Sequence, residues 1–375
     1  MKWNENVYRI FDILRFPLVV LVVFLHCKGE PGRLHIDWLN LGLVDGYDFL
    51  RNYISNVVSC VSVPTFFLMS GYLFYHHVDN LTYSLFKDKI KRRLKSLAVP
   101  YIFWILLFLV GNLFFVFRNT ESCNLWQSFY EYFAEHGHWH ILWDCNLMEV
   151  KTPAIGFVQD NSAPLLVPMW FVRDLMVVAL CSPMLWWCIR KIDVLFIVVL
   201  GICYLFQLWP YMHGVSSVSF FFFSIGIFMC KHAQKMDAFL KNTGWLIMFF
   251  SVLLSLLLVY LTDTQNVCQQ FVLRGYAIMA CISSLFIGYL CVEMKGTYLL
   301  QRLSKASFVV YAAHMVFVSK YVGVGLHCLM PANSVSLLTL KYLLVPVFTI
   351  AICLLVYFAF RKFCPKMMML LNGGR

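Results

Sequence analysis

The chain has 375 residues, of which 61% are hydrophobic and 13% are charged. Soluble globular proteins contain roughly 45–50% apolar and about 25% charged residues, so two soluble domains, a disordered chain and a collagen-like fibre are excluded. The net charge of +11 comes from short basic segments between apolar runs, which is typical of a membrane protein and does not indicate a nucleic-acid-binding face.

Ten apolar segments are candidate membrane spans, because a spanning helix needs about 20 mostly apolar residues. They are residues 10–27, 54–75, 97–117, 168–188, 194–209, 215–230, 244–262, 274–292, 307–325 and 337–360. The sixth is short, and the pair Trp209-Pro210 leaves the boundary between the fifth and sixth open. We therefore predict an all-α, polytopic membrane helix bundle of about ten transmembrane helices, which forms one domain over residues 1–375.

The first apolar segment has the basic start of a signal peptide, with Lys2 and Arg9 near its beginning. However, Asp12 and Arg15 lie inside it, and no small-residue cleavage site follows. We therefore expect a retained first helix.

The distribution of basic residues predicts the orientation of the bundle. With the N-terminus in the cytoplasm, 20 Lys and Arg residues fall in the inside segments and 6 in the outside segments. Lys and Arg are enriched in cytoplasmic loops. We therefore predict a multi-pass protein of the cell (inner or plasma) membrane with both termini cytoplasmic.

The first segment carries an arginine and a histidine at membrane depth, where ionisable side chains are costly and often functional. Arg15 and His26 are eleven residues apart, which places them on one helix face with roughly 16 Å between them along the axis. Asp12 lies one turn from Arg15 and is a candidate partner for it. The alternative is that Arg15 reaches the inner headgroups while His26 lies at the outer interface.

The second span and the basic loop after it contain candidate cofactor-binding residues. The pair Ser70-Gly71 forms a small surface that permits either a cofactor channel or close helix packing. The stretch Lys87–Lys95 contains six basic residues, including Arg92 and Arg93. Such a stretch suits anionic lipid headgroups and a polyphosphorylated cofactor equally well.

Two later spans also carry polar side chains at membrane depth. Arg173 and Asp174 lie early in the fourth span. Tyr311 and His314 are three residues apart in the ninth span and share a helix face. We treat Arg173, Tyr311 and His314 as pocket candidates, with a hydrogen-bonded packing role as the alternative for His314.

The long outer loop 118–167 has three further features. Its histidines lack a carboxylate or cysteine at metal-site spacing, so no metal is expected. Its two cysteines share a polar segment, where spacing alone does not decide whether they pair. Its aromatic side chains fit both sugar stacking and interfacial anchoring. The residues are His136, His138 and His140; Cys123 and Cys145; and Trp126, Tyr130, Tyr132, Trp139 and Trp143.

Six segments together resemble the integral-membrane acyltransferase family 3, which includes polysaccharide O-acetyltransferases. The chain departs from the family pattern at Ser96, where family members often have a second arginine in the basic loop. The contribution of that arginine has to come from Lys95 or Arg92, or is absent. The six segments occur in family order over roughly residues 8–320: Arg15 with His26, Val63–Tyr72, the basic stretch ending at Leu97–Tyr101, Trp170–Leu175, Phe220–Gly226 and Ser307–His314.

The resemblance implies transfer of an acyl group, usually acetyl from acetyl-CoA, to a hydroxyl of a sugar. It implies His26 as catalytic base supported by Arg15, with the basic loop beside the donor. A histidine suits base catalysis near neutral pH, and an arginine suits phosphate. The expected partners are acyl-CoA inside, a glycan or lipid-linked saccharide acceptor outside, and membrane lipids, without nucleic acid.

The main alternative is a transporter or flippase of lipid-linked sugars, which would also be a polytopic bundle with intramembrane charges. The ordered family segments and the absence of a visible sequence repeat favour the enzyme. Direct transfer is preferred over an acyl-histidine intermediate because no second nucleophile is apparent. The sequence leaves open which glycan and hydroxyl react, whether the acyl group is acetyl, longer or dicarboxylic, and the oligomeric state.

Overall fold

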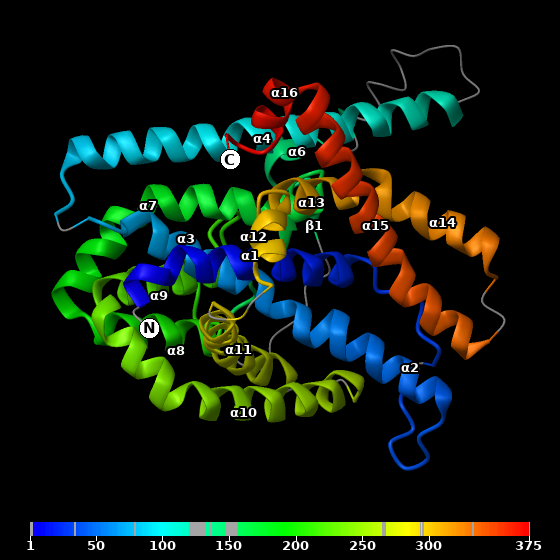
Figure 1. Cartoon of the computed structure of the whole chain (residues 1–375), viewed down its shortest axis with the longest axis horizontal. Helices are drawn as coiled ribbons and strands as arrows, with labels where there is room; N and C mark the ends of the chain where they lie inside the picture. The colour runs from blue at the N-terminus through cyan, green and yellow to red at the C-terminus, as the bar shows by residue number, and fades with distance from the viewer. Residues whose placement is uncertain are drawn as a thin grey trace.

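The computed structural model describes residues 3–374 except 34, 79, 120–132, 135–136, 138, 148–155, 265–267, 293, 295 and 332–333. The described chain is almost entirely helical (Figure 1). Its α-helices are α1 (Trp3–His26), α2 (Leu43–Asn52), α3 (Ser62–Tyr75), α4 (Tyr83–Asn119), α6 (His140–Trp143), α7 (Trp170–Ile192), α8 (Val194–Leu205), α9 (Ser217–Lys231), α10 (Met236–Asp263), α11 (Gln269–Cys291), α12 (Tyr298–Ser304), α13 (Ser307–Ala313), α14 (Ser319–Leu329), α15 (Val335–Phe363) and α16 (Pro365–Leu371). Shorter elements are η1 (Tyr53–Val57), η2 (Val58–Val61), η3 (Val167–Met169), η4 (Ala233–Lys235), η5 (His314–Val318), and the antiparallel strands β1 (Asn146–Leu147) and β2 (Ser162–Ala163).

The predicted spans coincide with helices, which confirms the all-α polytopic bundle. Within the described chain, seven helices or continuous helical runs are long and apolar enough to cross a membrane. The other three predicted spans correspond to α1, α8 and α9. With 12 and 15 residues, α8 and α9 are shorter than the roughly 20 residues a spanning helix needs. Length and hydropathy therefore support seven of the ten predicted spans.

Helix α1 lies at the centre of the molecule, with α4 along one side and α10 along the opposite side (Figure 1). It packs against α3, α11, α12, α13 and α15. Val7, Ile10, Phe11 and Leu14 are buried at the spacing of one helix face. Because protein surrounds this helix, its charged side chains can face a cavity inside the bundle at membrane depth.

Helices α3 and α9 touch through two glycines. A Cβ atom at Gly71 would lie 2.1 Å from the backbone oxygen of Phe223, and one at Gly226 would lie 2.1 Å from that of Leu68. Only glycine permits this approach from both sides. This is the close packing that was the alternative for the Ser70-Gly71 pair, and it accounts for Gly71.

The ninth predicted span is broken beside His314. Between α13 and α14 the chain forms the π-helical turn η5, in which Phe317 has the positive φ of 64°. The Phe317 ring stacks on Phe108 of α4 with centroids 5.2 Å apart. A Cβ atom at Gly111 would lie 2.2 Å from this ring, so α4 has a notch that receives it. Packing of Phe317 therefore stabilises a backbone conformation that costs about 1–3 kcal/mol for a non-glycine residue.

The C-terminal segment folds back onto α4 (Figure 1). After α15 the short α16 packs on α4, and the indole Nε1 of Trp104 donates to the backbone oxygen of Leu371 at 3.2 Å. Gly373 lies directly on Ser96, because a Cβ atom there would be 2.1 Å from the Ser96 backbone oxygen. These contacts bring Asn372 into the interior of the bundle, where it is 1% exposed.

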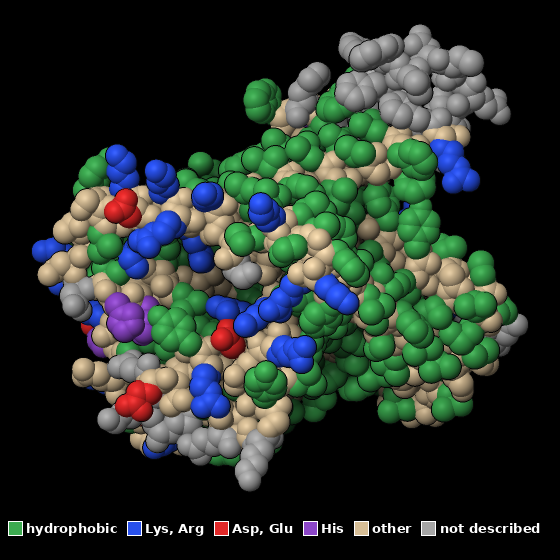
Figure 2. Space-filling model, turned by 45° about the horizontal axis from the view of Figure 1, so that its top comes forward, with side chains coloured by type: hydrophobic (Ala, Val, Ile, Leu, Met, Phe, Trp, Pro, Cys, Tyr) green, Lys and Arg blue, Asp and Glu red, His purple; other side chains and the backbone are tan. Residues whose placement is uncertain are grey.

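The turns between helices and the surface charges are unevenly distributed over the molecule. The turns after α3, α7 and α9 lie at one end of the molecule, and the turn between α14 and α15 lies at the other (Figure 1). On the face drawn in Figure 2, Lys and Arg gather in the left half and centre, whereas apolar side chains dominate the right half. The chain is thus a membrane protein by composition, helix length and surface.

Candidate active site

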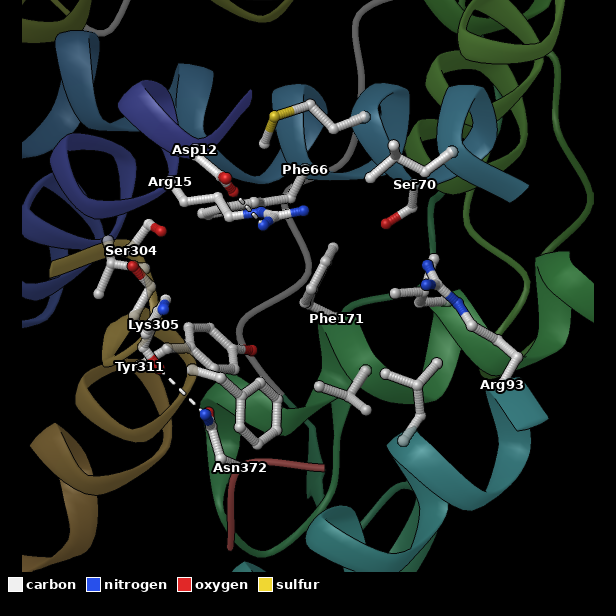
Figure 3. Close-up of a pocket in the computed structure, with 18 residues that line it drawn as sticks. Asp12, Arg15, Phe66, Ser70, Arg93, Phe171, Ser304, Lys305, Tyr311 and Asn372 are labelled. Atoms are coloured by element: carbon white, nitrogen blue, oxygen red, sulfur yellow. Dashed lines mark hydrogen bonds and ion pairs between the residues drawn. The ribbon is translucent and has the colours of Figure 1, made fainter. Parts of the chain in front are cut away.

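A cavity of about 400 Å³, here called the Arg15 cavity, lies inside the bundle. Its walls come from α1, α3, α4, α7, α12, α13 and the C-terminal segment (Figure 3). It brings together five residues that the sequence singled out from four distant segments: Asp12, Arg15, Ser70, Arg93 and Tyr311.

Arg15 projects into this cavity from α1. Its Nη1 donates to Asp12 Oδ1 at 2.5 Å, which confirms the predicted pair. The Arg15 side chain remains 33% exposed, and no second protein partner of its guanidinium is found among the described residues. Arginine has five N–H donors, so most remain available to a ligand.

Of the two arginines in the basic loop, one reaches the cavity. Arg93 extends into it from α4, opposite Arg15 (Figure 3). Its buried Nε has no hydrogen-bond partner in the described chain. Arg92 is exposed on the outside of α4 and donates from Nε to the backbone oxygen of Asp88 at 3.2 Å. Lys95 is also exposed and does not line the cavity.

Three polar cavity residues had not been singled out from the sequence: Ser304, Lys305 and Asn372. Asn372 Nδ2 donates to the backbone oxygen of Lys305 at 3.0 Å, so the C-terminal segment holds the α12–α13 turn (Figure 3). Lys305 adds a third positive side chain to Arg15 and Arg93. No sequence motif marks it, because it reaches the site only through the packing of α12 on α1.

His26 lies at the far end of α1 and lines a second cavity of about 530 Å³, here called the His26 cavity. Its ring centroid is 5.3 Å from that of His314, which is fully buried. Tyr311, one turn before His314, lines the Arg15 cavity, and its hydroxyl donates to the backbone oxygen of Pro168. Tyr311, His314 and His26 therefore form a row of neighbouring rings from one cavity to the other.

The protonation of His314 can be read from its contacts. Its Nδ1 lies 2.7 Å from the backbone oxygen of Tyr311, so Nδ1 carries the proton and donates. Its Nε2 is buried and has no partner in the described chain. This unpaired imidazole nitrogen beside His26 is able to accept a hydrogen bond.

Arg173 lies outside both cavities. Its Nε donates to Asp174 Oδ1 at 2.9 Å, its Nη1 to Ser162 Oγ at 3.1 Å and to the Trp143 backbone oxygen, and its Nη2 to Asp160 Oδ2 at 3.4 Å. The side chain is 1% exposed. Arg173 thus links the outer loop to α7 through hydrogen bonds, and its guanidinium is enclosed by protein acceptors.

The outer loop is described only in part. Cys123, Trp126, Tyr130, Tyr132, His136 and His138 lie outside the described residues, so the possible disulfide to Cys145 stays a prediction. Over the described part of the chain, no cluster of His, Cys, Asp and Glu could hold a metal ion. The expectation that the loop histidines lack a carboxylate at helix spacing was wrong for His140, because Asp144 follows it by four residues and its carboxylate contacts Nδ1 of both His140 and His213. Burial alone would raise the pKa of Asp144, but these two hydrogen bonds hold it below its usual value.

Comparison with known proteins identifies the family. The sequence profile described as "Acyltransferase domain" (Acyl_transf_3) matches residues 8–358. The chain belongs to acyltransferase family 3. This membrane acyltransferase is also 22% identical to the succinoglycan biosynthesis protein ExoH of Rhizobium meliloti (strain 1021), over 378 residues covering 99% of this chain and 94% of that protein. No solved structure matches it.

The family match confirms the predicted enzyme class and disfavours a transporter. Within this membrane acyltransferase, Asp12, Arg15, Ser70, Arg93 and Tyr311 surround one cavity, whereas His26 faces another. Arg92, Gly71, Arg173 and His314 line neither cavity, and their roles at the site stay predictions.

Proposed function

We propose that this membrane acyltransferase moves an acyl group, acetyl from acetyl-CoA, onto a hydroxyl of a cell-surface or lipid-linked glycan. The observation that carries the proposal is the pair of cavities, with Tyr311 lining the first, His26 lining the second and His314 beside both rings. A transferase with donor and acceptor on opposite membrane faces needs such an arrangement. The glycan acceptor is supported by the name of the relative, a succinoglycan biosynthesis protein.

The Arg15 cavity has side chains suited to an acyl-CoA. Arg15, Arg93 and Lys305 face it together with a single carboxylate, Asp12, which already pairs with Arg15. The buried Arg93 Nε without a protein partner is a donor that a phosphate oxygen would satisfy. The remaining walls are largely apolar, including Phe171 and Leu175, and suit a thin pantetheine arm.

In this proposal His26 acts as the general base. The bound thioester supplies the activated acyl group. His26 removes the proton of the acceptor hydroxyl while its oxygen forms the new ester bond and the carbon–sulfur bond breaks. The leaving CoA thiolate then takes up this proton from His26, which restores the neutral imidazole. Direct transfer remains preferred, and His314 positions the His26 ring through the contact between the two imidazoles.

The proposal requires the donor end of the bundle to face the cytoplasm and the His26 end to face outward, with both termini cytoplasmic. The excess of Lys and Arg in the predicted inside segments supports this orientation. Single cysteines introduced at Ile90 and His140 test it in intact cells. A membrane-impermeant thiol reagent should label position 140 and not position 90, and labelling of position 90 would overturn the orientation.

The catalytic assignment is tested with purified protein in nanodiscs, radiolabelled acetyl-CoA and surface glycan as acceptor. His26→Ala should lower transfer by roughly 100- to 10,000-fold with unchanged thermal stability, because base catalysis contributes about this much. His35→Ala is the matched control, since His35 is exposed on the loop after α1. Near-normal transfer by His26→Ala would place the base elsewhere, with His314 as the next candidate. Label bound to the protein without acceptor would instead support an acyl-histidine intermediate.

A further inference from the structure

The His26 cavity is lined by more positive than negative side chains. The described residues that line it include three lysines, Lys28, Lys320 and Lys341, but one carboxylate, that of Glu30. The lysines come from the segment after α1, from α14 and from α15. The positive charge therefore surrounds the cavity and does not come from a single exposed helix face.

Two of these lysines lack a carboxylate partner. Lys341 Nζ donates to His327 Nδ1 at 2.7 Å, which requires that this nitrogen of the ring be unprotonated. The contact holds the ammonium at the cavity wall without neutralising it. Elsewhere a lysine of the bundle is neutralised, since Lys231 Nζ lies 3.0 Å from Asp193 Oδ1. In the described chain, neither Lys320 nor Lys341 forms such an ion pair.

Aromatic side chains form another part of the same wall. Tyr47 and Tyr342 line the cavity with ring centroids 6.2 Å apart and planes at 86°. The Tyr47 hydroxyl donates to the Glu30 backbone oxygen at 2.6 Å, and the Tyr342 hydroxyl lies 2.8 Å from Ser55 Oγ. Tyr47 and Tyr342 are only 3% and 2% exposed, so the two rings fix the shape of the cavity wall and offer a ligand little surface. The ammonium groups at this wall suit a sugar that carries negative charge.

We propose that the His26 cavity binds an acceptor with an anionic group, a carboxylate or a phosphate, close to the hydroxyl that is acylated. The inference rests on the proposed function, in which His26 faces the acceptor. Lys320 and Lys341 pair with the anion, and the ion pair places the hydroxyl beside His26. The anion belongs to an acidic sugar or to the diphosphate of a lipid-linked saccharide, and the experiment separates these sources.

Binding is measured first, because it does not depend on turnover. The probes are a tetrasaccharide of glucose and glucuronic acid, its carboxyl-reduced neutral form, and the neutral form linked to a polyprenyl diphosphate. The wild-type protein in neutral-lipid nanodiscs should bind one charged probe at least tenfold more tightly than the neutral tetrasaccharide. Preference for the acidic tetrasaccharide identifies a carboxylate, and preference for the lipid-linked form identifies a phosphate. Equal binding of all three probes, or binding of none, overturns the proposal.

The lysines are tested as Lys320→Gln and Lys341→Gln, with Lys241→Gln on the exposed surface of α10 as the matched control. Each cavity variant should weaken binding of the preferred charged probe by about tenfold, because a hydrogen bond to a charged group is lost. Binding of the neutral probe and the KM for acetyl-CoA should stay unchanged. An equal loss for charged and neutral probes overturns the proposal, as does a raised KM for acetyl-CoA. A response only to added anionic lipid assigns the lysines to headgroups and also overturns it.

The two proposals fail separately. Charge-selective binding that depends on Lys320 and Lys341, with no transfer to any probe, retains the anionic site and refutes the proposed acetyl transfer. Transfer to neutral and charged probes with equal KM retains the proposed function and refutes the anionic site.

Discussion

Arg15 and Arg173 are both arginines beside an aspartate within a helix, and the sequence made both of them site candidates. The structure separates them. Arg173 is 1% exposed and surrounded by protein acceptors, whereas Arg15 is 33% exposed and holds one carboxylate. Of the two, only Arg15 therefore keeps N–H donors that a ligand could use.

The reason lies in what each helix packs against. Near Arg173 the outer loop returns over α7 and supplies Asp160, Ser162 and the Trp143 carbonyl. Near Arg15 the neighbours α3, α12 and α13 present mainly apolar or small side chains and leave a cavity. Removing one partner of a buried ion pair strongly destabilises the fold, because the remaining charge is buried without compensation.

The largest expected effect tests whether Arg173 stabilises the fold. Arg173→Met leaves Asp160 and Asp174 buried without their cation, which should cost about 3–5 kcal/mol of stability. We expect a large loss of folded protein, measured by thermal unfolding in detergent and by yield. Arg302→Met on the exposed face of α12 is the control and should behave as wild type. A stable Arg173→Met protein that had lost only transfer would place Arg173 with Arg15.

The functional side is tested by Arg15→Lys. The variant should fold at wild-type yield, while kcat/KM for acetyl-CoA should fall by roughly 10- to 100-fold, because an ammonium cannot replace the planar fork of a guanidinium. Transfer assays at varied acetyl-CoA, run beside thermal unfolding, measure both. Parallel losses of stability and transfer would contradict a cavity-facing role.

A third effect concerns the broken helix that carries His314. Gly111→Ala places a methyl group against the Phe317 ring, and such overpacking should cost about 1–3 kcal/mol. Transfer should fall as well, because the turn η5, which begins at His314, shifts. Gly275→Ala in α11 is the control, since nothing lies within 4 Å of its new Cβ atom. If both alanine variants unfold at the wild-type temperature, the notch in α4 is not what maintains the break.

The smallest effect separates neighbours in the basic loop. Arg93→Gln should raise the KM for acetyl-CoA about tenfold, because it removes a cavity-facing donor, and Arg92→Gln should leave it within roughly twofold. Initial rates at varied donor and acceptor concentrations distinguish donor from acceptor effects. Equal changes in the two variants would favour headgroup binding by the whole loop.

Much of the fold was predictable because each membrane-spanning helix is encoded by one continuous run of apolar residues. A run of apolar residues has to form a helix in lipid, so the spans and the helical class follow from composition and periodicity. The prediction was weakest for 194–209 and 215–230, since short helices cross only with support from their neighbours. The Asp12–Arg15 pair was also predictable, because residues three apart meet on any helix.

The sequence by itself determined that this protein is an all-helical membrane acyltransferase with Arg15 and His26 on one helix. Only the tertiary structure decided that these two residues face different cavities and that Arg93, but not Arg92, reaches the first. It also decided that Lys305 and Asn372 join that site, and that Lys320 and Lys341 surround the other. The physical reason is that a cavity is made where helices distant in sequence fail to fill the space between them, and no local pattern encodes that space.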